Sequence, residues 1–109
     1  MAKTNAAFMS GVPELLILRI LQREEMYGYQ LVRAIRVVSL DAFDLAEGVV
    51  YPALHTLETK GLLKAKAKVH EGRSRIYYSI TPKGKTRLGE LVANWERVSQ
   101  GLANVLHGN

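Results

Sequence analysis

Cysteine is absent from the 109 residues of this sequence. Its absence excludes a disulfide, a zinc site built on thiolates and a thiol redox switch. Long apolar runs are absent too, since charged residues interrupt every stretch before it reaches the ~18 residues that a membrane-spanning helix needs. The opening segment, Met1–Phe8, has one basic side chain and no sustained apolar core, so it does not resemble a secretory signal. We therefore expect a cytoplasmic protein with no membrane partner.

The groups that catalysis needs are also scarce. The sequence has no glycine loop of the phosphate-binding type and no nucleophile elbow, and its three histidines, His55, His70 and His107, lack the spacing of metal ligands. Asp41 and Asp44 are close in sequence, but as catalytic carboxylates they would need a pocket, whereas a solvated connector needs nothing more. We expect neither an enzyme nor a metal site nor a cofactor.

The net charge of +5 is unevenly distributed along the chain. Up to Lys60 there are six basic and seven acidic side chains, a net charge of −1, whereas the rest has nine basic and three acidic, a net charge of +6. A charged run is often only a solvated face, so its place in the fold must decide its meaning. Any contact with a polyanion is expected in the second half.

Hydrophobic spacing predicts three helices between about Ser10 and Gly61. The first ends near Arg23 and is apolar on nearly every side. After a break at Met26–Gln30 comes a second, amphipathic helix, and Ser39–Leu45 connects it to the third.

The third helix is expected to be short and half exposed. It begins near Glu47 or Gly48, because Pro52 is tolerated only close to a helix start, and Gly61 ends it as a glycine just past the last turn. Its inward face consists of Val50, Leu54 and Leu57, and the side chains that point elsewhere are Glu47, Val49, His55, Thr56 and Lys60.

The period then changes from that of a helix to that of a strand. Apolar residues at 63, 65, 67 and 69 alternate with Lys64, Lys66 and Lys68, and after a polar turn at 70–74 the alternation resumes with Ile76, Tyr78 and Ile80 on one side. This pattern predicts a two-stranded hairpin with one apolar and one cationic face.

A last helix is predicted from Pro82 to about Leu106, with Thr81 as its N-cap. At ~25 residues and ~37 Å it is longer than the rest of the fold can cover, so we expect a second copy to bury its excess. The alternative is that it folds back on its own domain. We expect one continuous compact domain, made of a unit at 1–81 and a dimerisation helix at 82–109. The expected dimer seam repeats at steps of three and four residues and comprises Leu88, Leu91, Trp95, Val98, Leu102 and Val105.

Helix, helix, short helix and hairpin is the element order of a winged helix-turn-helix, a mainly α (α+β) fold that binds DNA. The third helix would enter the major groove, with Tyr51, His55 and Thr56 as candidates for base or phosphate contacts, although each is also explained as a surface or half-buried side chain. The hairpin cations would meet phosphates, which position the protein without specifying sequence. These cations are Lys64, Lys66, Lys68, Arg73 and Arg75. The alternative is a winged module that binds protein.

Five segments in this order resemble the PadR-type transcriptional regulators, named for repression of phenolic acid decarboxylase. They are Tyr27-Gly28-Tyr29, the 48–54 segment from Gly48 to Leu54, 57–62, Gly72-Arg73-Ser74-Arg75 and 77–84. The resemblance implies a homodimeric repressor of double-stranded operator DNA, in which the terminal helices cross and the first helices complete the interface. The DNA-contacting residues expected from the fold and the resemblance are Tyr27, Gly48, Val49, Tyr51, His55, Thr56, Lys64, Lys66, Arg73, Arg75 and Tyr77.

The sequence departs from that family pattern in two places. His55 and Thr56 stand where relatives often carry Lys or Arg, and Ile76 stands where a basic residue is common. We therefore expect the remaining hairpin cations to carry more of the phosphate contact. The chain ends soon after the last helix, as in the short PadR subgroup, so no separate effector domain is expected.

The segment Asn94–Val98 is similar to that of multidrug-binding members of the family. The resemblance implies a ligand site at Trp95 and Val98, where a tryptophan from each copy would stack a planar aromatic compound, often a cationic one. The alternative is that Trp95 only packs in the dimer interface.

Overall fold

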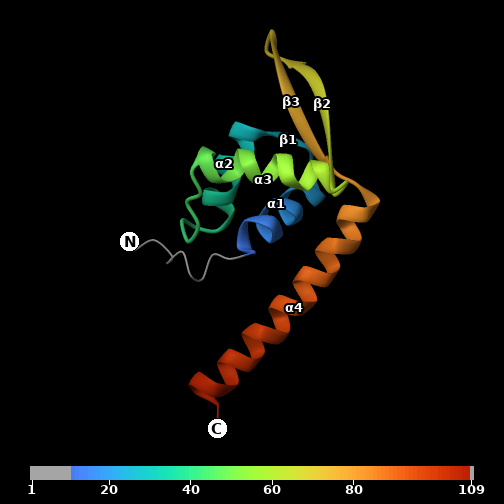
Figure 1. Cartoon of the computed structure of the whole chain (residues 1–109). Helices are drawn as coiled ribbons and strands as arrows, with labels where there is room; N and C mark the ends of the chain where they lie inside the picture. The colour runs from blue at the N-terminus through green and yellow to red at the C-terminus, as the bar shows by residue number, and fades with distance from the viewer. Residues whose placement is uncertain (1–10, 109) are drawn as a thin grey trace.

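Four helices and three strands make up residues 11–108, the part of the chain that this computed structural model describes. Figure 1 shows α1, α2 and α3 gathered together, the β2–β3 hairpin projecting from them, and α4 leaving in the opposite direction. This is the mainly α arrangement with a hairpin and a long last helix that the sequence predicts. The elements are α1 (Val12–Arg23), β1 (Met26–Tyr27), α2 (Gly28–Val38), α3 (Glu47–Thr59), β2 (Leu63–His70), β3 (Arg73–Ile80) and α4 (Pro82–His107).

The core lies where the three short helices meet the base of the hairpin. Each helix contributes one apolar face, and burial of a Leu or Ile side chain stabilises the fold by about 1.5–3 kcal/mol. The predicted inward face of α3 is confirmed, since Val50, Leu54 and Leu57 are all buried. The largest fully buried side chains are Ile17, Leu18, Leu31, Ile35, Val50 and Leu54.

The helix ends follow the expected boundaries closely. Pro13 lies in the first turn of α1, and the expected start at Ser10 lies outside the described residues. At the start of α2, the backbone N–H of Tyr27 donates to Oε1 of Gln30 at 3.2 Å, which satisfies one donor at the helix N-terminus. The connector between α2 and α3 contains no further helix or strand.

The sheet has a third strand that the sequence pattern did not reveal. The expected break at Met26–Gln30 contains the two-residue strand β1, which pairs with β3 so that the strand order is β1-β3-β2. All pairing is antiparallel, with Met26 opposite Tyr78 and Tyr27 opposite Tyr77. This short strand fixes the start of α2 against the hairpin.

The apolar face of the hairpin is buried only at its base. Leu63 and Tyr78 belong to the core, whereas Val69 in the outer half is 76% exposed and Ile76 is also exposed. The predicted alternation is therefore correct, but the outer part of this face has no cover within the described chain.

The turn into α4 is fixed by several polar contacts. The hydroxyl of Thr81 accepts a hydrogen bond from the backbone N–H of Gly84 at 3.0 Å and donates to the carbonyl of Gly61 at 2.7 Å. Thr81 is thus the N-cap, as predicted. Lys83 Nζ also donates to the carbonyl of Lys60 at 3.0 Å. These contacts fix where α4 leaves the end of α3.

The first half of α4 packs on α1, and the second half does not. Arg87 forms an ion pair with Glu14 of α1 at 3.3 Å, and Leu88 is only 2% exposed. The structure therefore corrects the assignment of Leu88 to a dimer seam, because this side chain already belongs to the core of its own chain. The second half of α4 extends away from the short helices, so the helix does not fold back (Figure 1). Among residues 11–108, no helix is both long enough and apolar enough to cross a membrane.

Candidate nucleic-acid interface

An arginine lies against an aromatic ring on one face of the sheet. The guanidinium carbon of Arg75 is 4.4 Å from the ring centroid of Tyr27, which is the geometry of a cation–π contact. The ring of Tyr77 meets that of Tyr27 edge to face, with centroids 5.4 Å apart. His70 is the next neighbour, with its ring centroid 6.0 Å from that of Tyr27.

Strand register explains why these side chains meet. Tyr27 and Tyr77 are direct partners across β1 and β3, so their side chains lie on the same face of the sheet. Arg75 is two residues before Tyr77 and therefore shares that face. The pairing of β1 with β3 thus places Arg75 beside the ring of Tyr27, although the two residues are distant in sequence.

The guanidinium of Arg75 is partly withdrawn from solvent. Its Nε atom is buried and has no hydrogen-bond partner within residues 11–108. Buried polar atoms in proteins are nearly always paired, so an unpaired one calls for an explanation. Contact with the Tyr27 ring accounts for the position of the group but not for its unused donors.

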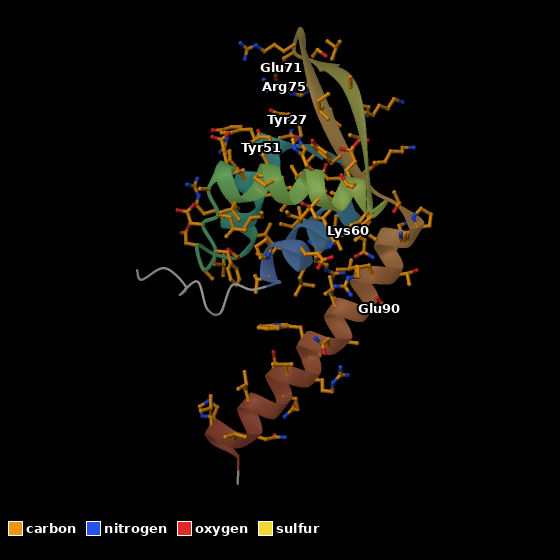
Figure 2. All side chains as sticks on the ribbon, in the orientation of Figure 1. Tyr27, Tyr51, Lys60, Glu71, Arg75 and Glu90 are labelled. Carbon is orange, nitrogen blue, oxygen red and sulfur yellow. The ribbon has the colours of Figure 1, made fainter. Side chains whose placement is uncertain are left out.

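Tyr51 approaches the same region from α3. Burial raises the pKa of the Tyr51 hydroxyl above its usual value of 10.0, the carboxylate of Glu47 raises it further, and the positive charge of Arg75 opposes both effects. The charge of Arg75 therefore acts at the Tyr51 hydroxyl. Figure 2 shows Tyr27, Tyr51 and Arg75 gathered between the hairpin and α3, whereas Lys60 lies at the other end of α3.

Lys68 of the hairpin is engaged within the chain. Its ammonium group pairs with the carboxylate of Glu25, which follows α1, and lies 5.3 Å from the ring centroid of Tyr77. The pair borders an open pocket of about 460 Å³ that Glu24, Gln30 and Val69 also line. Lys68, expected as a phosphate contact, is thus partly neutralised by a residue that the sequence analysis did not single out.

The remaining candidates are exposed and lie apart from this cluster. The outer face of α3 presents Gly48, Val49, His55 and Thr56 to solvent. In the hairpin, the side chains of Lys64, Lys66 and Arg73 are exposed and make no hydrogen bond or ion pair with any other residue of the described chain. Of the expected contacts, the structure therefore brings together Tyr27, Tyr51, Arg75 and Tyr77 and leaves the others spread along α3 and the hairpin.

Comparison with known proteins gives a consistent family assignment. The model of the PadR-like transcriptional regulator family matches residues 17–90, so the chain belongs to this family. Transcriptional regulator Rv3488 of Mycobacterium tuberculosis is 34% identical over 83 residues, which are 76% of this chain and 75% of that protein. The family is one of transcriptional regulators rather than of enzymes, in agreement with the expectation from sequence.

Solved structures confirm the winged-helix fold. A PadR-like transcriptional regulator from Bacillus cereus superposes with a TM-score of 0.84 at 33% identity, over 95% of this chain and 100% of that one. A transcriptional regulator from Clostridium thermocellum gives a TM-score of 0.86 at 24% identity, over 94% and 98% of the two chains, which supports the fold alone.

Proposed function

We propose that this protein is a cytoplasmic repressor that binds a pseudo-palindromic operator as a homodimer. The observation that carries the proposal is the set of hairpin cations that have no partner among residues 11–108, next to a third helix whose outer face is exposed. Exposed and uncompensated cations are what a phosphate backbone attracts. Those cations are Lys64, Lys66 and Arg73.

In this proposal α3 enters the major groove and the hairpin contacts the flanking backbone. A major groove of about 12 Å admits a helix, and the side chains that would reach its floor are the exposed ones on α3. Phosphate contacts of the hairpin would fix register, while α3 would supply sequence preference. The exposed candidates on α3 are Val49, His55 and Thr56, and the half-buried Tyr51 lies at the edge of the same surface as a further candidate.

The second half of α4 supports the homodimer. Four large apolar side chains on one stripe are exposed, from Val98 at 42% to Val105 at 83%. A stripe of a/d-type residues at this spacing is the seam of a helix pair, and a second copy offers an identical stripe. Residues 11–81 would then contact DNA and 82–108 would pair the protomers. The proposed seam comprises Leu91, Trp95, Val98, Leu102 and Val105, with Leu91 half buried at its inner end.

The same stripe gives the repressor a place for a ligand. In a two-fold dimer, Trp95 of each copy approaches its mate, and the two indoles with Val98 would hold a planar aromatic compound, best a cationic one. Binding there would change how the α4 helices cross. Helix-turn-helix dimers match half-sites ~34–36 Å apart, so a small change in crossing weakens operator binding.

Fluorescence anisotropy tests operator binding directly. A labelled duplex from immediately upstream of this protein's own gene is titrated over a salt series beside a scrambled duplex. We expect tight binding that prefers the native duplex and weakens steeply with salt, by about 0.9 log units of affinity per neutralised phosphate for each log unit of salt. Binding that is indifferent to both sequence and salt, even among duplexes selected from a random pool, would favour a protein-docking module instead.

Tryptophan fluorescence tests the ligand site, because the chain has a single tryptophan. A planar aromatic cation added to DNA-free protein should quench Trp95, and the same compound should release the operator. The Trp95→Ala variant should remain a folded dimer on the operator and lose the response to the compound. A response retained in this variant would remove Trp95 from the ligand site.

A further inference from the structure

The side chain of Arg75 is more constrained than that of a fully exposed arginine. One face of its guanidinium is covered by the Tyr27 ring at 4.4 Å, and its Nε atom is buried. An exposed arginine samples many rotamers, and fixing them costs up to ~2 kcal/mol on binding. In this structure much of that ordering precedes any contact with a ligand.

We propose that Tyr27 is a positioning residue that holds Arg75 as one half of a preformed oxyanion clamp, and that the hydroxyl of Tyr51 is the other half. The expected ligand is a backbone phosphate of the operator, so this inference rests on the proposed function and deepens it. It changes the role of Tyr27 from a direct DNA contact to a support for Arg75.

The chemistry of the cluster favours an oxyanion. Arg75 makes no hydrogen bond or ion pair within residues 11–108, so its guanidinium donors are unused there. The nearby carboxylate of Glu71 lies 3.6 Å from His70 instead. A planar guanidinium with free donors and no carboxylate partner is matched by the oxygens of a phosphate.

Two adjacent residues place both halves of the clamp. The ring of Tyr27 supports Arg75, while the missing side chain of Gly28 leaves space for the ring of Tyr51. Burial and the carboxylate of Glu47 raise the pKa of the Tyr51 hydroxyl, and the positive charge of Arg75 lowers it, so the guanidinium is within electrostatic reach of this hydroxyl. Tyr27 and Gly28 thus contact Arg75 of β3 and Tyr51 of α3, respectively.

Two substitutions of Tyr27 separate support from direct contact. Tyr27→Phe keeps the ring face and removes the hydroxyl, whereas Tyr27→Leu keeps apolar bulk and removes the π system. In the anisotropy assay we expect Tyr27→Phe to bind the operator about as well as the wild type. Tyr27→Leu should lose about fivefold to thirtyfold in affinity, the size of a cation–π contact. If both variants lose affinity equally, the hydroxyl itself is the DNA contact and the inference is wrong.

Arg75→Gln completes a double-mutant cycle. This variant should lower the salt slope by about 0.9, the value for one phosphate. Adding Tyr27→Leu to it should cause little further loss of operator affinity, because Tyr27 then has no guanidinium to position. Additive losses would show that the two side chains act independently and would overturn the clamp.

A measurement without DNA keeps this inference distinct from the proposed function. In nitrogen-15 NMR spectra of the free protein, the Arg75 Nε–H should exchange slowly with water in the wild type and in Tyr27→Phe, and rapidly in Tyr27→Leu, with all three equally folded by circular dichroism. Equal exchange in all three would overturn the positioning role even if the operator binds. Failure of the wild type to bind any duplex would instead overturn the proposed function, with the exchange pattern still reporting on Arg75.

Discussion

The ring of Tyr51 occupies the space into which a side chain at Gly28 would project. A methyl group on Gly28 would overlap several ring atoms, and the ring is held there by its place on the first turns of α3. The contact joins the start of α2 to the start of α3. It therefore sets how closely the start of α3 packs against the start of α2.

Gly28→Ala should destabilise the protein, because the Tyr51 ring must move or the two helices must separate. Overpacking of this kind costs about 1–3 kcal/mol, reduced by the better helix propensity of alanine, worth about 1 kcal/mol. Urea unfolding followed by circular dichroism measures the difference. The matched control is Gly48→Ala on α3, where a methyl group would meet nothing within 4 Å. It should be neutral or slightly stabilising, and equal effects at both sites would contradict the account of Gly28.

Glu25→Gln should strengthen DNA binding by releasing Lys68. In the wild type this carboxylate holds the lysine ammonium in an ion pair, so the lysine has a partner to give up before it meets a phosphate. Release adds one phosphate contact, which steepens the salt slope by about 0.9. Stability should change by at most about 1 kcal/mol, because the pair is partly exposed.

Glu24→Gln is the control for this effect. It removes the same charge from the neighbouring position in the same pocket, and Glu24 has no ion-pair partner in the described chain. It should strengthen DNA binding only because the protein loses one negative charge, and the salt dependence of the affinity should change little. Equal slopes in the two variants would mean that Lys68 already reaches the DNA in the wild type.

The long periodic elements were predictable from the sequence, and short or pairing-dependent features were not. The 26 residues of α4 and the alternation of the hairpin give many repeats of their period. The strand β1 has two residues, too few to show alternation, so only its pairing with β3 identifies it. The spacing of apolar residues in α4 is the same whether Leu88 lies in a dimer seam or in the core. Only the packing of α1 on α4 shows that it lies in the core.

The same limit applies to the candidate site. Tyr27, Tyr51, Arg75 and Tyr77 were all identified as single candidates from fold and family resemblance. Their mutual contacts depend on register between β1 and β3, which one sequence does not fix. The ion pair between Glu25 and Lys68 was missed for the same reason, because it needs the end of α1 beside the hairpin. A strand of alternating tyrosine and arginine opposite another tyrosine is the one signal that could have indicated the cluster.

The stability of the protein should fall as the pH rises above about 10, and Tyr78 should contribute to that fall. Burial raises the pKa of the Tyr78 hydroxyl above 10.0, and the charge of Glu58 raises it further. The folded state therefore favours the neutral phenol. Above the ordinary pKa, the unfolded chain loses this proton more readily than the folded one, so stability is full below that pH and is lost as the pH rises through the folded-state pKa.

Thermal unfolding between pH 8 and 11, about the ordinary tyrosine range, checks this contribution. Tyr78→Phe should unfold at a temperature that depends less on pH than that of the wild type. The control is Tyr29→Phe, which changes a ring that is exposed on α2. Parallel curves for wild type and Tyr78→Phe would show that other groups control the alkaline loss.

Leu102→Glu should prevent formation of the proposed dimer and leave a monomer. In the proposed seam this side chain faces its counterpart on the second copy. Burying a carboxylate there without a partner costs several kcal/mol of dimerisation free energy. Analytical ultracentrifugation over a concentration series measures the change. Operator affinity should fall with it, because the two DNA-binding units are no longer joined in one molecule. Gln100→Glu adds the same charge to an exposed position on the opposite side of α4 and should leave the dimer intact. If the Leu102→Glu protein remains dimeric while its helix content is unchanged, another surface pairs the protomers and the exposed stripe of α4 must serve a different partner.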